Sequence, residues 1–117
     1  MTIVTLEEAK VYLRQDSNFE DALISTLIAT ASFKCCEIAR LTASQWESIR
    51  TADATSSDLE INGETYTATE LIHMKELLRV AVFYCIGYLY EHREEADHHD
   101  LDLTLRNLLC AIREGVF

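Results

Sequence analysis

Hydrophobic residues in the first third of the chain recur at steps of three and four, the spacing of amphipathic helices. A first helix is predicted over about residues 5–14, because Thr5 and the glutamate three residues later form a capping box. Ser17 and the glutamate three residues after it repeat this signature and predict a second helix over about residues 17–41. The apolar stripe of this second helix consists of Leu23, Ile24, Leu27, Ile28, Ala31, Cys35 and Ile38.

Residues 42–68 carry a weaker pattern of Ser, Thr, Asp and Ala, so we expect the least ordered part of the chain there. One short amphipathic stretch, Ala43 to Ile49, contains Trp46. The segment from Leu59 to Tyr66 predicts a β-hairpin with these two residues opposite each other, because its central Asn-Gly supplies the positive φ angles of a type I′ turn. Since an isolated two-stranded ribbon is marginal in water, this one needs a surface or a neighbouring molecule to lie on.

A third helix is predicted from Thr69 to Glu95 and contains the most hydrophobic part of the sequence. From Leu77 to Tyr90 every residue except Arg79 is apolar, aromatic or small. This run is shorter than the roughly 20 apolar residues that cross a bilayer, so it predicts a helix covered by protein. A last helix ends near Gly115 as C′ residue, and one side of it carries Leu101, Leu105, Leu108, Leu109 and Ile112.

These elements predict one all-α domain over residues 1–117, with two long antiparallel helices, two or three shorter ones and a small β-hairpin between the long pair. Helices 1 and 2 fall in residues 1–41, the hairpin loop in 42–68, and helices 3 and 4 in 69–117. The other helices can cover only part of so hydrophobic a third helix, which favours self-association through the remaining face. The residues that we expect to meet a neighbouring subunit are Leu23, Ile24, Val82, Phe83, Ile86, Tyr90 and Arg93.

Composition agrees with a helical fold and narrows the range of partners. The 117 residues include no Pro and three Gly, so few positions interrupt helical hydrogen bonding. Twenty acidic against ten basic side chains give a formal net charge of -10, which disfavours direct binding to nucleic acid or anionic lipid. The N-terminus lacks the basic start and long apolar stretch of a secretory signal, which indicates a cytosolic protein.

One cluster of side chains offers atoms that could hold a divalent metal ion: His92, Glu95, His98 and His99. Its spacing matches no di-iron pattern, and we favour a solvated helix end. The four cysteines contain no C-x-x-C motif, so we expect them to be reduced and at least half-buried. No phosphate-binding loop or nucleophile motif occurs in the sequence, and we expect neither a cofactor nor a catalytic residue.

Four blocks of the sequence together resemble one known family. They are Leu-Glu-Glu-Ala-Lys at 6–10 with Tyr-Leu-Arg at 12–14, Glu-Asp-Ala-Leu-Ile at 20–24 with Leu27, Ile28 and Ala31, Ala-Val at 81–82 leading into Leu-Tyr-Glu-His-Arg-Glu at 89–94, and Leu-Leu at 108–109 with Ile112 and Arg113. In order, separation and total length these blocks are similar to the small head-tail connector proteins of tailed bacteriophages and prophages. The chain differs in lacking the Pro that the family often has before its central helix and near its end.

The resemblance implies a structural protein with no catalytic activity. Its protomers would assemble side by side into a ring beneath the portal, dodecameric on the virion, while a free protomer can be monomeric. DNA would pass through this ring between head and tail without sequence-specific binding. The implied partners are the portal protein and a head-tail stopper or tail-completion protein, and no membrane is involved. The implied location is the virion neck, and the host cytoplasm during assembly.

Two other classes of function remain open. A small cytosolic helical enzyme that depends on a metal or a thiol would use the histidine cluster, and stoichiometric metal in protein purified without a His tag would favour it. An acidic regulator that binds a basic partner has only the net charge in its support, and the same charge also serves solubility.

Overall fold

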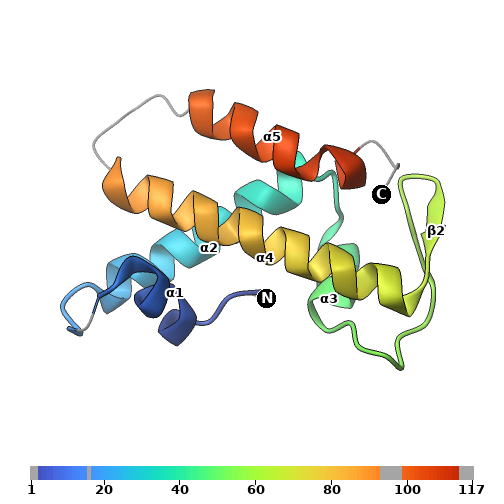
Figure 1. The fold of residues 1–117 in the computed structure, drawn as a ribbon, viewed down its shortest axis with the longest axis horizontal. Coiled ribbons are helices and arrows are strands. Elements are labelled where there is room, and N and C mark those ends of the chain that lie inside the picture. The colour runs from blue at the N-terminus through green and yellow to red at the C-terminus, as the bar shows by residue number, and fades with distance from the viewer. Residues whose placement is uncertain (1–2, 16, 93–98, 114–117) are drawn as a thin grey trace.

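The computed structural model of the protein describes residues 3–15, 17–92 and 99–113, which form five helices and one antiparallel hairpin (Figure 1). The elements in chain order are α1 (Leu6–Leu13), α2 (Asp21–Ile38), α3 (Ala43–Arg50), β1 (Leu59–Ile61), β2 (Glu64–Tyr66), α4 (Ala68–Glu91) and α5 (His99–Arg113). The predicted mostly helical fold with a small hairpin is confirmed at this level. Within the described residues no single helix is long and apolar enough to cross a bilayer, and α2 and α3 meet that measure only as a pair bent by 112°.

Three helices begin with the same capping box. In each, a threonine hydroxyl accepts a hydrogen bond from the backbone N–H three residues later, and the Glu or Gln there accepts one from the threonine N–H. The pairs are Thr5 with Glu8 before α1, Thr42 with Gln45 before α3, and Thr67 with Glu70 before α4. The first pair was predicted from the sequence and is confirmed, and the third starts α4 at Ala68, close to the predicted residue.

The predicted capping of the second helix by Ser17 is wrong. The helix begins after Glu20, which makes no capping hydrogen bond through its side chain. The Ser17 hydroxyl donates instead to Gln15 Oε1 at 3.2 Å, so the turn before the helix uses the group that would have capped it. The helix also ends earlier than predicted, at Ile38, because Arg40 takes up a left-handed backbone conformation with φ of 58°.

The segment 42–68 holds more structure than its weak hydrophobic pattern predicts. Trp46 and Ile49 of α3 are buried in the core, and the Gln45 side-chain amide donates to the Glu60 carbonyl oxygen at 3.2 Å. The predicted amphipathic stretch from Ala43 to Ile49 thus forms α3, and a few large side chains anchor the segment although its overall pattern is weak.

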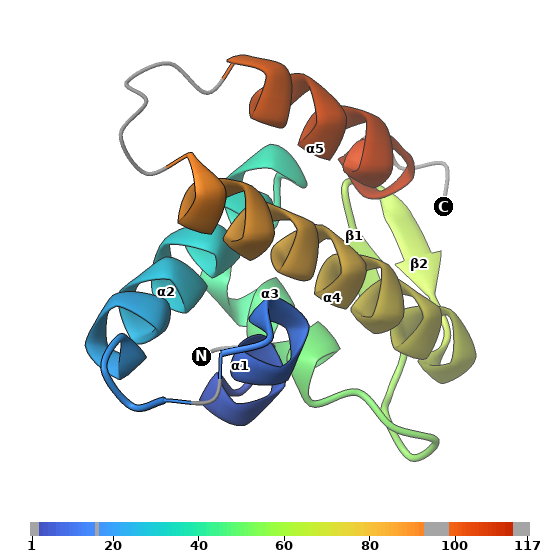
Figure 2. The ribbon, with the colours of Figure 1, turned by 60° about the vertical axis from the view of Figure 1, so that its left-hand side comes forward.

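The hairpin has the predicted register. Leu59 lies opposite Tyr66, and Asn62 and Gly63 form the turn with φ angles of 52° and 90°. The ribbon lies at the end of the molecule where α4 begins and α5 ends (Figures 1 and 2). Tyr66 is buried, and the Asn62 amide donates to the Ile112 carbonyl oxygen at 3.1 Å, so the hairpin rests on its own chain.

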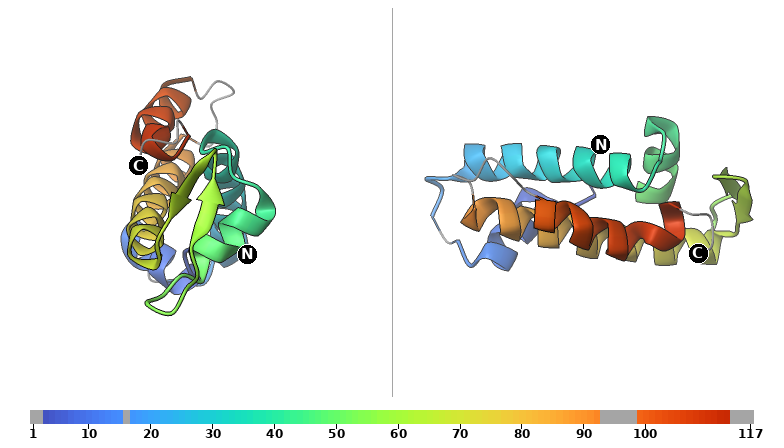
Figure 3. Two further views of the ribbon diagram at one scale, coloured as in Figure 1. Left: turned by 90° about the vertical axis from the view of Figure 1, so that its right-hand side faces the viewer. Right: turned by 90° about the horizontal axis from the view of Figure 1, so that it is seen from above.

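The core lies between α2 and α4, and α1 and α5 pack on this pair from opposite sides (Figures 1 and 3). The predicted apolar side of the last helix is confirmed, because four of its five residues are completely buried: Leu101, Leu105, Leu109 and Ile112. Leu108 is half-buried. The predicted end of the third helix at Glu95 and the predicted terminator Gly115 lie outside the described residues.

Candidate interaction surface

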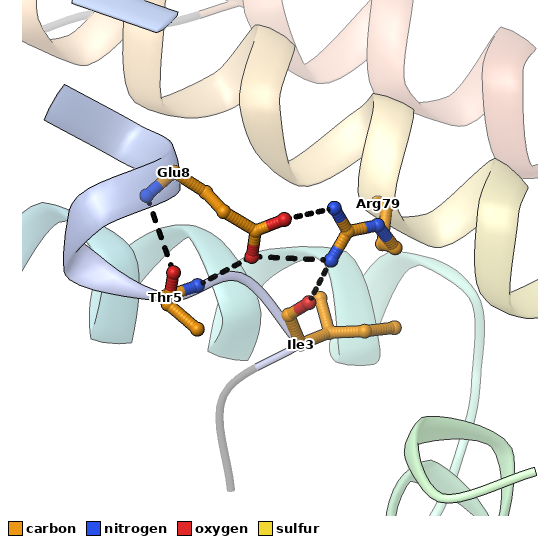
Figure 4. Close-up of polar contacts among 4 residues, drawn as sticks. All are labelled: Ile3, Thr5, Glu8 and Arg79. Atoms are coloured by element: carbon orange, nitrogen blue, oxygen red, sulfur yellow. Dashed lines mark hydrogen bonds and ion pairs between the residues drawn. The ribbon is translucent and has the colours of Figure 1, made fainter. Parts of the chain in front are cut away.

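Arg79, the single charged residue within the apolar run of α4, ties α1 to α4 (Figure 4). Its guanidinium donates to the Ile3 carbonyl oxygen at 2.8 Å and forms a two-pronged ion pair with the Glu8 carboxylate. The same carboxylate accepts a hydrogen bond from the Thr5 N–H at 3.0 Å. The hydrogen bond from Arg79, followed by that from Thr5, lowers the pKa of Glu8 to about 2. Glu8 therefore joins a helix cap and an interhelix ion pair in one side chain.

Aromatic rings continue this contact along the helix. The Arg79 guanidinium lies over the Phe83 ring at 5.5 Å from its centroid, and the Phe83 ring stacks on Tyr12 with centroids 5.1 Å apart. Gly87, one turn later on α4, leaves room for Tyr12, since a Cβ atom there would lie 3.0 Å from Tyr12 Cε2. The contact between α1 and α4 is thus made by rings and an ion pair.

Part of this contact remains open to solvent. Val11 on α1 is 79% exposed and Val80 on α4 is 56% exposed, and Tyr12 and Tyr84 are exposed beside them. We call Val11, Tyr12, Val80, Phe83 and Tyr84 the aromatic face. A depression of about 460 Å³ in this face is lined by Glu7, Glu8, Val11, Tyr12 and Phe83.

A larger groove, of about 700 Å³, adjoins the aromatic face where the second half of α4 passes α1. Its lining includes Arg14, Glu91 and His92. It also includes four tyrosines: Tyr12, Tyr84, Tyr88 and Tyr90. The Gln15 amide donates to the Tyr90 hydroxyl at 3.2 Å, and the His92 ring stacks on Tyr88. Exposed tyrosine, with an apolar ring and a polar tip, is typical of protein-protein interfaces.

The seven residues predicted to meet a neighbour fall into three groups. Three are completely buried in the protomer's own core, where they cannot contact another subunit: Ile24, Val82 and Ile86. Three are half-buried at its edge: Leu23, Phe83 and Tyr90. Arg93 lies outside the described residues. Assigning the first three to an interface is therefore corrected, because Ile24 of α2 and Val82 and Ile86 of α4 have no exposed surface left for a neighbour.

The residues predicted to meet a neighbour did not include Val11, Tyr12, Val80 and Tyr84 of the aromatic face. A signal for the last two is present, since the exposed polar residues of the first half of α4 recur at three- and four-residue steps, and the same steps lead on to Val80 and Tyr84. No comparable signal marks α1, whose two turns are too short to define a face.

The histidine cluster is not assembled in the part of the chain that the structure describes. There, no group of three or more His, Cys, Asp or Glu side chains is placed to hold a metal ion. His92 Nδ1 lies 3.0 Å from the Tyr88 carbonyl oxygen, and His99 is exposed at the start of α5. Glu95 and His98 lie outside the described residues.

The four cysteines are free thiols in different surroundings. Cys35 of α2 and Cys85 of α4 are completely buried, and their mutual hydrogen bond, together with burial, raises the pKa of Cys35. Cys36 is half-buried, and burial raises its pKa as well. Cys110 is exposed, which corrects the expectation that all four are at least half-buried: it lies away from the leucine side of α5. The buried pair is inaccessible to a substrate.

The most distinctive surface of the described residues is the aromatic face with its adjoining groove. A cluster of exposed rings of this kind is suited to contact with another macromolecule. Comparison of the chain with protein-family models, with characterised proteins and with solved structures gives no match.

Proposed function

We propose that the protein is a structural head-tail connector of a tailed bacteriophage or prophage, which forms a ring beneath the portal through which DNA passes. The observation that carries this proposal is the aromatic face, which stays exposed after every described helix has packed. Tyrosine and other aromatic side chains supply much of the binding energy in protein interfaces. A neighbouring subunit would cover Val80 and Tyr84, which are the two exposed residues in the apolar run of α4.

In the proposed protomer, α2 and α4 are the antiparallel long pair and α1 and α5 flank it. A closed ring repeats one contact between neighbours, so every subunit buries the same parts of its surface and no subunit is left with an uncovered contact surface. The formal charge of -10 suits a channel protein, because acidic walls let DNA move past without binding tightly. The portal above and a stopper or tail-completion protein below would be its other partners in the virion neck.

Two variants test this proposal. Val80→Asp and Tyr84→Asp each place a charge on an exposed position of the aromatic face, so the helical fold is expected to survive. We expect the natural chain to form rings at high concentration or on the portal ring of the same phage, as measured by electron microscopy and sedimentation. Both variants should stay monomeric with unchanged circular dichroism.

Phe19→Asp is the matched control, because Phe19 is 96% exposed and lies in the turn before α2, outside the aromatic face. It should assemble like the natural chain. Rings formed by Val80→Asp and Tyr84→Asp, or a natural chain that stays monomeric both alone and with the portal, would show that the proposal is wrong. Portal, protease and capsid genes next to the gene for this chain would support it independently.

A further inference from the structure

We infer that a groove between α2 and α5 is the second half of the subunit contact and receives the aromatic face of another copy of this chain. This inference rests on the proposed assembly. A ring is built from a head-to-tail contact, in which each subunit offers two different surfaces. The aromatic face supplies one of them, and the other must be sought elsewhere on the same protomer.

The groove has a volume of about 520 Å³, and its lining combines two apolar side chains with three basic and two acidic ones. Two apolar residues of α2, Phe33 and Ile38, line it. Phe33 is 66% exposed, which is unusual for so large an apolar side chain. The Arg113 guanidinium of α5 donates to the Ile38 carbonyl oxygen at 3.1 Å and so fixes the end of α5 against the end of α2. An aromatic side chain that is mostly exposed to water is a typical contact point for apolar groups of a partner.

The charges of the two surfaces are complementary. Three basic side chains against two acidic ones line the groove, on a chain whose formal net charge is -10. Lys34 pairs with Asp102 at 2.7 Å, whereas Arg106 is exposed and forms no ion pair with another described residue. On the aromatic side, Glu7 is exposed and likewise unpaired within the described chain, and exposed Glu76 lies one turn before Val80.

Copies of so acidic a protein repel each other in most orientations. The orientation that brings the acidic edge of the aromatic face to the basic groove is the one in which this repulsion is relieved. Charge therefore favours another copy of this chain as the occupant of the groove, and it also sets the relative orientation of the two copies. Because exposed charges are screened by ions, added salt should weaken the contact.

The two surfaces also lie where a head-to-tail contact needs them. α1 contributes to the aromatic face and α5 to the groove, and these two helices lie on opposite sides of the α2–α4 pair (Figures 1 and 3). One protomer cannot bring them together within itself. A symmetric pair of aromatic faces would leave the groove vacant, whereas head-to-tail repetition uses both surfaces on every subunit.

Mixing two blocked variants tests the inference. Phe33→Asp blocks the groove and Val80→Asp blocks the aromatic face, and both positions are exposed. Neither variant should assemble alone. In an equimolar mixture, the intact face of the first fits the intact groove of the second, so we expect a one-to-one pair that cannot grow. Native mass spectrometry with a mass tag on one chain measures this product.

The outcomes separate this inference from the proposed function. If Phe33→Asp assembles like the natural chain while Val80→Asp does not, the groove is not the partner surface and the connector proposal stands. If both variants are monomeric and their mixture gives no pair, the aromatic face of one copy does not seat in the groove of another and the inference is wrong. Arg106→Glu reverses an exposed charge of the groove and leaves its apolar residues unchanged. It should weaken assembly, as Phe33→Asp does. A natural chain that never assembles overturns both.

Discussion

The two sides of α4 are covered in different ways. Toward α2 and α5 the contact is completely buried, and Leu78, Val82 and Ile86 have no exposed surface left. Toward α1 the contact consists of the Arg79 ion pair and the stacked rings of Tyr12 and Phe83, with solvent at its margin.

One hydrophobic helix can therefore have one side that stabilises the protomer and another that tolerates solvent. Aliphatic side chains stabilise by leaving water entirely, so the sealed side contributes to folding of the single chain. Rings with polar partners tolerate partial exposure, so the other side can exist in a free protomer and be covered later. Overall hydrophobicity does not separate these purposes, whereas residue type and exposure do.

The largest expected effect comes from the sealed side. Leu105→Ala removes a completely buried side chain of α5 and should lower the free energy of unfolding by about 2–5 kcal/mol. Val80→Ala on the aromatic face should change it by no more than about 0.5 kcal/mol. Urea unfolding at low protein concentration measures both. Equal losses would show that the two sides of α4 contribute alike to the protomer.

The ion pair on the α1 side should make stability depend on pH. The pKa of Glu8 is lowered from 4.5 to about 2, so the unfolded chain binds more protons in this range and stability falls as the pH falls from about 4.5 toward 2. The full shift corresponds to about 3 kcal/mol, but the Glu8 side chain is 37% exposed and solvent screening reduces this to about 1–2 kcal/mol.

Glu8→Gln isolates this contribution from that of the other carboxylates. We expect the variant to be less stable than the natural chain near neutral pH and to approach it as the pH approaches 2, in denaturant titrations at each pH. A difference in unfolding free energy that stayed constant over the whole range would contradict the role given to the ionised carboxylate.

The ring contact should couple Tyr12 to Phe83 by a smaller amount. In a double-mutant cycle of Tyr12→Leu and Phe83→Leu, we expect a coupling of about 0.5–1.5 kcal/mol, because the stack is lost in each single variant while apolar contact remains. Additive effects would mean that the two rings contribute to stability only through the area that they cover.

Local signals in the sequence predicted several of these elements. The Thr5 capping box, the Asn62-Gly63 turn and the leucine side of α5 were correct because each depends on residues close together in the chain. Ser17 failed as a cap because Gln15, two residues before it, engages its hydroxyl. Competition of this kind depends on side-chain positions that a motif does not contain.

The open side of α4 could not be predicted in the same way. The run from Leu77 to Tyr90 has no periodicity of its own, so Val80 is distinguished from Val82 only when the polar steps of the first half of α4 are continued into it. The choice between them is made in the fold by α2 and α5, which bury Val82 and leave Val80 in solvent. The excess of apolar residues in this run is visible in the sequence, whereas the side of α4 that stays exposed is seen only in the tertiary structure.

The smallest effect on stability, and a direct measure of sealing, is expected from the thiols. Cys110 is exposed, so Cys110→Ser should leave stability unchanged, and a small neutral alkylating reagent should label Cys110 in the folded chain. Cys35 and Cys85 should label only when α2 and α4 separate, at a rate that rises with denaturant, because both thiols are buried and the pKa of Cys35 is raised. Leu105→Ala should speed their labelling and Val80→Ala should not. Labelling of Cys85 as fast as that of Cys110 would mean that the side toward α2 and α5 also opens readily, and the α1 side would then no longer be distinguished as the surface left for a neighbour.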